Sequence, residues 1–94
     1  MNKYESIIIV NPSLEEQGIK DLITKFTDLI NKDGKVESVE DMGKKKLAYE
    51  IKKCPEGCYY LFNFEANPSF IAELERIYRI TDGILKFITV RKED

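Results

Sequence analysis

The 94-residue chain contains no histidine and no tryptophan, and its longest aliphatic run is the four residues from Ile7 to Val10. The absence of histidine removes the commonest general base and the commonest metal ligand. A run of four aliphatic residues is too short for a membrane span or for the core of a signal peptide. We therefore expect a cytoplasmic protein.

Cysteine is also scarce, since Cys54 and Cys58 are the only two and lie in the segment CPEGC. Their spacing is not the Cys-x-x-Cys of redox motifs. Structural zinc requires four ligands, which two thiols without histidine do not supply. In the cytosol both thiols stay reduced, and Cys54-Pro55-Glu56-Gly57 is typical of a turn. We therefore predict no metal site and no cofactor.

Catalytic motifs are missing as well. The chain has no G-x-G-x-x-G segment, no P-loop and no nucleophile with a candidate histidine. Its 17 acidic residues are spread over predicted helix surfaces and strand edges. The protein is therefore predicted not to be an enzyme.

Charge is distributed unevenly along the chain, although 15 basic and 17 acidic residues give a formal net charge of only -2. Residues 43–53, GKKKLAYEIKK, hold five lysines and one acid, Glu50, so their formal charge is +4. Consecutive lysines cannot share one strand face, but they suit a bulge or turn that follows a phosphate backbone. A solvated hairpin is the alternative explanation.

The hydrophobic pattern predicts one domain, residues 1–94, with strands at 3–10, 36–42 continuing into 46–52, 58–66 and 84–91. A first helix begins at Ser13, which forms a capping box with Glu16, and ends at a left-handed Gly34. Val36 and Val39 have opposite parity, which predicts a bulge. A second helix begins at Asn67-Pro68 and ends before Asp82-Gly83. Residues 92–94 form a short tail.

This order, β-α-β-β-α-β, predicts an α+β ferredoxin-like fold built from two interleaved, right-handed β-α-β units. Its four-stranded antiparallel sheet has the order 4-1-3-2, with two helices on one face. Lys3, Arg91 and Lys92 are then expected to meet at one end of the sheet, beside Tyr4.

The other sheet face is predicted to be open, because no segment remains to cover it. Alternation places Cys58, Tyr60, Phe62, Phe64 and Ala66 toward the helices and Tyr59 and Leu61 outward. Either parity of the first strand leaves aliphatic side chains exposed. An exposed apolar face is typical of a partner surface, although an ordinary surface without function is the alternative. The predicted partner surface comprises Ile7, Ile9, Leu61 and Ile88.

The segment GKKKLAYEIKK resembles the second strand of the bacterial small-subunit ribosomal protein six family, in which a glycine and a basic stretch precede Leu-Ala-Tyr-x-Ile. Further matches are Tyr4-Glu5, Asn11-Pro12, Gly57 before an aromatic third strand, and Arg79-Ile80 before the last strand. The resemblance covers essentially the whole chain. It implies a ferredoxin-like fold and a structural role in the small subunit of cytoplasmic ribosomes.

The resemblance also implies binding to the central domain of small-subunit ribosomal RNA, as a heterodimer with small-subunit ribosomal protein eighteen. It implies RNA contacts for Lys3, Tyr4, Lys44, Lys45, Lys46, Tyr49, Lys86 and Lys92, and the charge pattern adds Lys52, Lys53 and Arg91. Tyr49 alternates with Leu47 and Ile51, so a place in the core or at its rim is its alternative role. No membrane and no small-molecule substrate are expected.

A function of another class is a small regulatory domain that dimerises through the open sheet and binds a small molecule at the seam. No ligand fingerprint in the chain supports it. A tight dimer stabilised by a metabolite would favour it over RNA binding.

Overall fold

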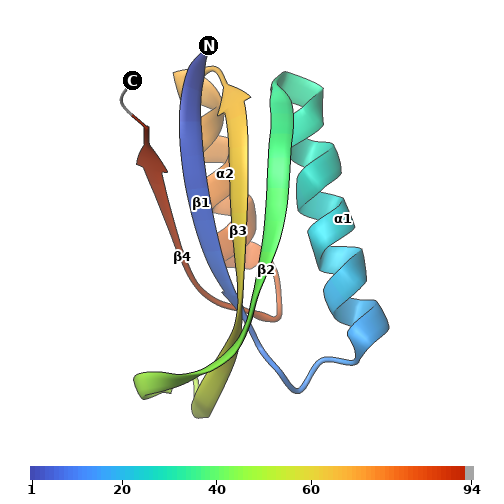
Figure 1. Cartoon of the computed structure of the whole chain (residues 1–94), viewed down its shortest axis with the longest axis vertical. Helices are drawn as coiled ribbons and strands as arrows, with labels where there is room; N and C mark the ends of the chain where they lie inside the picture. Colours follow the sequence, from blue (N-terminus) through green and yellow to red (C-terminus); the bar gives the residue numbers. More distant parts are fainter. Residues whose placement is uncertain (93–94) are drawn as a thin grey trace.

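The computed structural model describes residues 1–92, whose elements follow the order β-α-β-β-α-β. They are β1 (Asn2–Val10), α1 (Glu16–Asp33), β2 (Lys35–Ile51), β3 (Cys54–Ala66), α2 (Pro68–Ile80) and β4 (Ile84–Arg91). The strands form one antiparallel sheet in the order β2-β3-β1-β4, and both helices cover the same face (Figure 1). The predicted fold is confirmed, because 4-1-3-2 is this order read from the other edge. Residues 93 and 94 of the predicted tail lie outside the described residues.

Neither of these two helices is long and apolar enough to cross a membrane, and residues 1–92 contain no other candidate span.

The main core lies between the sheet and the helices and follows the predicted alternation of β3. Phe62, Phe64 and Ala66 are buried there, and Cys58 and Tyr60 pack against this core. β1 directs its even-numbered side chains to the same face, which determines the parity that the sequence left open. The buried residues of this core are Tyr4, Ile8, Val10, Phe26, Ile30, Phe62, Phe64, Ala66, Phe70, Leu74, Tyr78 and Ile84.

Three hydroxyl groups form a polar link between β1, α2 and β4 beside this core. Ser6 Oγ is buried, 2.9 Å from Tyr78 Oη and 3.0 Å from Thr89 Oγ1. Burial raises the pKa of Tyr78 far above its ordinary value of 10.0, although the hydrogen bond with Ser6 opposes this. The phenol therefore stays neutral at physiological pH, and its hydrogen bond offsets the cost of burying it.

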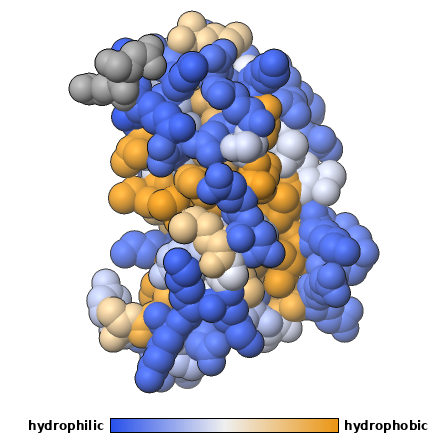
Figure 2. Space-filling view, viewed as in Figure 1, coloured by the Kyte–Doolittle hydropathy of each residue, from blue (hydrophilic) through white to orange (hydrophobic). Residues whose placement is uncertain are grey.

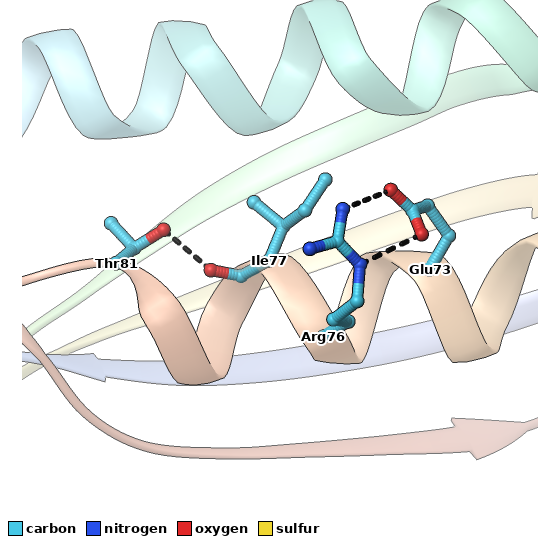
Figure 3. Close-up of polar contacts among 4 residues, drawn as sticks. All are labelled: Glu73, Arg76, Ile77 and Thr81. Carbon is cyan, nitrogen blue, oxygen red and sulfur yellow. Dashed lines mark hydrogen bonds and ion pairs between the residues drawn. The ribbon is translucent and has the colours of Figure 1, made fainter.

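The second helix begins as its Asn67-Pro68 pair predicts, with the Asn67 carbonyl accepting a 2.9 Å hydrogen bond from the Phe70 amide. On its exposed side, Arg76 donates to both carboxylate oxygens of Glu73, at 3.0 and 2.6 Å (Figure 3). These bonds lower the pKa of Glu73. At the end of α2, the Thr81 hydroxyl donates to the Ile77 carbonyl, so the last turn has a side-chain partner (Figure 3).

The predicted start of the first helix is wrong. α1 begins at Glu16, and Glu15 stands before it without a side-chain cap. The amide and the hydroxyl of Ser13 instead donate to Asn11 Oδ1, at 2.9 and 2.8 Å. The Asn11 side chain therefore holds residues 11–13 in a local turn, so Ser13 is not free to cap the helix.

The end of the first helix also differs from the prediction. Gly34 has φ -147°, which is extended backbone and not the left-handed conformation. A Cβ at this position would lie 1.9 Å from the carbonyl oxygen of Glu65. Glycine is therefore required because β3 passes very close to the chain here.

The turn between β2 and β3 lies at Lys52 and Lys53, which both have positive φ, 50° and 65°. The prediction of a turn at Cys54–Gly57 is wrong, because Cys54 pairs with Ile51 and the segment belongs to β3. Two left-handed residues match the twist of a two-residue hairpin. Residues 36–42 and 47–51 form one strand, and the predicted bulge follows Val36, where the register shifts before Ser38.

The open face of the sheet is partly covered by the chain itself. The hairpin projects beyond the sheet in Figure 1 and bends over β1 and β4, where Ile9, Leu47 and Leu85 form a second buried cluster. The Lys52 ammonium donates to the Ile84 carbonyl at 3.3 Å and joins the turn to β4. The expectation that nothing covers this face is therefore wrong at the hairpin end.

Candidate nucleic-acid interface

The lysines of residues 43–53 divide between the two faces of the hairpin, as alternation along β2 requires. Lys45 lies on the open face, with its ammonium 5.4 Å from the centroid of the Tyr59 ring. Lys44 pairs with Cys58 across the hairpin and forms an ion pair of 3.8 Å with Glu56 on the opposite face. The lysine segment therefore presents cations to both sides.

On the open face, the hairpin end and the sheet enclose a pocket of about 130 Å³. Tyr49 stands at its edge with 71% of its surface exposed, so of the alternative roles predicted for Tyr49 the core position is wrong and a rim position remains. Lys86, which pairs with Ile9 on β1, brings a second exposed lysine to the same pocket. The lining residues are Ile9, Leu47, Ala48, Tyr49, Ile51, Tyr59 and Lys86.

On the opposite face, a recess of about 350 Å³ separates the hairpin from the loop after β1. Lys44 and Lys53 line it together with residues 11–13. Glu56 lies in the same recess and offsets part of this positive charge. The lysines that face this recess are therefore partly neutralised.

The second basic group, Lys3, Arg91 and Lys92, assembles at one end of the sheet as predicted. The Lys92 amide donates to the Lys3 carbonyl at 2.9 Å, and Arg91 pairs with Tyr4 across β1 and β4. Two members form ion pairs, Lys3 with Glu65 at 4.0 Å and Lys92 with Glu5 at 3.4 Å. These acids reduce the net positive charge at this end.

The predicted contact residue Tyr4 lies in the core. Only 7% of it is exposed, and its ring stacks on Phe64 with 5.7 Å between centroids. Even-numbered side chains of β1 point to the helices, so the Tyr4 ring packs in the core beneath Lys3, Arg91 and Lys92.

The two basic groups lie at opposite ends of the sheet, with the start of β1 at one end and the hairpin at the other (Figure 1). β1 connects them with nine residues, a length of about 30 Å. An RNA that touches both groups must therefore extend along the molecule, which sequence reasoning did not predict.

An apolar stripe crosses three strands on the uncovered part of the open face. Ile7 pairs with Leu61 on β3 and with Ile88 on β4. Ile88 is 55% exposed, and Val90, which the sequence prediction omitted, is 49% exposed. Figure 2 shows apolar side chains across the middle of this face, bordered by polar ones. Ile9 is the exception in the predicted set, because the hairpin end buries it.

The two cysteines are partly buried, Cys58 against the main core and Cys54 against the second buried cluster. Both are free thiols, and burial raises the pKa of Cys58, so this thiol stays protonated at physiological pH. Within residues 1–92, no three side chains of cysteine, aspartate or glutamate come close enough to hold a metal ion.

Comparison with known proteins shows which sequences this chain resembles. Residues 3–91 match the family model described as ribosomal protein S6. The chain is 50% identical to small ribosomal subunit protein bS6 of Clostridium novyi, over 99% of both chains. The bS6 protein of Clostridium beijerinckii is 52% identical, again over 99% of both chains.

Solved structures show the same likeness. The crystal structure of 30S ribosomal protein S6 from Thermotoga maritima has a TM-score of 0.91 and 36% identity, covering 97% of this chain and 87% of that one. The C-terminal domain of MgtC from Mycobacterium tuberculosis covers 99% of this chain and 89% of its own, with a TM-score of 0.60. At 13% identity, the latter shows a shared fold alone.

Proposed function

The chain belongs to the ribosomal protein S6 family, and from this premise we propose that it binds the central domain of small-subunit ribosomal RNA together with small-subunit ribosomal protein eighteen. Family membership makes the protein a structural component of the small ribosomal subunit and not an enzyme. The predicted cytoplasmic location agrees with this role.

The observation that carries the RNA-binding proposal is the open side of the hairpin end. Lys86 is exposed there in the same pocket as Tyr49, and Lys45 is exposed above the Tyr59 ring. Neither lysine forms an ion pair with any residue among 1–92. Exposed cations without acidic partners are available to neutralise phosphates, and a cation beside an aromatic ring suits a nucleotide. This local arrangement outweighs a formal net charge of -2, because binding depends on where the cations lie.

The remaining basic residues extend the proposed interface in two directions. The hairpin carries four further lysines, Lys44, Lys46, Lys52 and Lys53. About 30 Å away, at the other end of the sheet, the second basic group contacts the phosphate backbone of the RNA. Lysine acts as a point charge here and positions the RNA without reading bases. The proposed RNA-contact residues are Lys3, Lys44, Lys45, Lys46, Tyr49, Lys52, Lys53, Lys86, Arg91 and Lys92, with Tyr4 supporting them from the core.

The apolar stripe is the proposed surface for the partner protein. It comprises Ile7, Leu61, Ile88 and Val90, which lie next to one another on three neighbouring strands. A partner that covers these side chains would remove apolar surface from water. A basic partner would also neutralise phosphates that this acidic chain leaves unpaired.

Binding of the isolated protein to a central-domain RNA fragment, with and without protein eighteen and at two salt concentrations, tests the proposal. We expect tight, salt-sensitive binding that requires the partner. The triple variant Lys44→Glu, Lys45→Glu, Lys46→Glu should lose binding. A matched triple on α1, Lys20→Glu, Lys25→Glu, Lys32→Glu, changes the net charge equally and should bind like the parent. Equal effects of the two triples, or no binding under any condition, would overturn the proposal.

A further inference from the structure

The pocket on the open face of the hairpin end exists because β2 and β3 bend tightly over β1. Ile9 and Leu47 form its apolar floor, with 7% and 9% of their surfaces exposed. Gly57 permits this approach, because a Cβ there would lie 2.2 Å from Ile9 Cγ2. The floor is therefore held by packing within the fold and is formed before any ligand arrives.

Tyr49 does not contribute to that packing. Its ring is largely exposed although it lies between Leu47, which is buried, and Ile51, which is half-buried. A large exposed aromatic surface at the edge of a preformed apolar pocket offers a flat ligand one face to stack on. The pocket's volume of about 130 Å³ is well below the roughly 300–1,000 Å³ of sites that enclose a whole ligand. It suits a single ring whose attached groups remain outside.

The charges around the pocket indicate which charge the groups attached to the ring should carry. Lys86 lies on its wall, Lys45 lies above the neighbouring Tyr59 ring, and none of the seven lining residues is acidic. A ligand that joins a flat, uncharged ring to negative charge on either side matches this arrangement. A nucleotide within an RNA strand has this chemistry. An aromatic side chain of a protein partner fills the floor but leaves both lysines without counter-charges.

We propose that this pocket receives one unpaired RNA base, which stacks on Tyr49 while Lys45 and Lys86 neutralise the flanking phosphates. The proposal rests on the proposed function and makes it more specific. A paired base inside an A-form helix cannot turn its face to a protein ring, so the target must be a bulge, loop or internal mismatch. The pocket then recognises a single-stranded position within the central domain of the RNA. The basic group at the other end of the sheet contacts only the RNA phosphate backbone.

Fluorescence of 2-aminopurine tests the proposal, because stacking quenches this base analogue. The probe is the central-domain RNA fragment with 2-aminopurine replacing its unpaired adenines one at a time, titrated with the protein and protein eighteen together. We expect quenching at one position with the parent and with Tyr49→Phe, which keeps the ring. Tyr49→Leu keeps an apolar side chain without the ring. It should abolish the quenching and weaken RNA binding about 5- to 150-fold.

Ile80→Ala is the matched control, because Ile80 is a similarly exposed apolar residue on α2 and lies outside the pocket. It should leave both readouts unchanged. Salt-sensitive RNA binding without a Tyr49-dependent change at any substituted position would overturn this proposal but leave RNA binding intact. Complete absence of RNA binding would overturn the proposed function itself. If Tyr49→Leu instead weakens only the binding of protein eighteen in the absence of RNA, the pocket holds a protein side chain and the proposal is wrong.

Discussion

Gly57 lies where the hairpin end crosses β1, and its replacement by alanine tests how closely these segments pack. The added methyl carbon would lie 2.2 Å from Ile9 Cγ2 and 3.7 Å from Leu47 Cδ2. Carbon atoms in contact are about 3.5–4.0 Å apart, so Ile9 or the hairpin must move by about 1.5 Å. Ile9 is buried and β-branched, so it has few alternative rotamers. We expect Gly57→Ala to lower the free energy of unfolding by about 1–3 kcal/mol.

Urea unfolding followed by circular dichroism measures this loss, and thermal unfolding should show a fall in Tm of about 4–8 °C per kcal/mol. In an Ile9→Ala background the methyl group has room, so the same substitution should cost less than about 0.5 kcal/mol. Gly18→Ala is the control: its nearest neighbour would be Leu14 Cβ at 3.9 Å, and helix propensity predicts a gain of up to about 1 kcal/mol. An undiminished cost of Gly57→Ala in the Ile9→Ala background would refute the close approach of hairpin and β1.

Four further predictions follow from the packing and charge of individual side chains. Tyr78→Phe removes the hydrogen bond between Tyr78 and buried Ser6, but Ser6 keeps Thr89 as a partner. Urea unfolding should therefore show that the free energy of unfolding falls by about 0.5–1.5 kcal/mol; a fall above about 3 kcal/mol would show that Thr89 does not satisfy Ser6. Burial raises the pKa of Tyr78 above 10.0, so the unfolded chain releases this proton first and stability should fall as pH rises above about 10. Burial also raises the pKa values of Cys58 and Tyr60, so Tyr78→Phe should reduce the slope of stability from pH 9 to 11 without abolishing it, and an undiminished slope would assign the effect elsewhere. Lys45→Ala and Lys86→Ala should each reduce the slope of log affinity against log salt by about 0.7–0.9, and parallel salt titrations would reveal an unchanged slope if no phosphate is contacted. Ile88→Glu should weaken the complex with protein eighteen at least about fivefold in calorimetry while leaving Tm nearly unchanged, because Ile88 is more than half exposed; normal partner binding would remove the stripe from the interface.

The alternation within strands was predictable because it depends only on neighbouring residues. Phe62 and Phe64 point to the helices and Tyr59 points away, as the two-residue period of a strand requires. The helix start at Asn67-Pro68 was predictable for a similar reason, since proline constrains its own backbone. In each case the physical cause lies within a few residues of its effect.

Two of the wrong predictions concern the start of α1 and the turn between β2 and β3, and in both the preferred local conformation had a competitor. Ser13 is suitable as a helix cap, but Asn11 accepts its hydrogen bonds instead. Pro55 and Gly57 are typical of a turn, yet the chain turns at Lys52 and Lys53, two residues that rarely adopt positive φ. Pairing of Cys54 with Ile51 and of Glu56 with Lys46 extends the ladder beyond the preferred turn sequence. The position of this turn was thus decided by strand pairing, whereas the helix start was decided by a competing contact two residues away.

The sequence by itself determined the order of elements, the helix-facing residues of β3 and the concentration of lysine in residues 43–53. Only the tertiary structure decided where those lysines act. The bend of the hairpin over β1 buries Ile9 and Leu47, leaves Tyr49 exposed, and brings Lys86 from the far end of the sequence beside it. A strand pattern specifies which side chains share a face, but curvature and strand order specify which faces meet. Those depend on contacts between residues far apart in the chain, here Gly57 against Ile9 and Lys52 against Ile84.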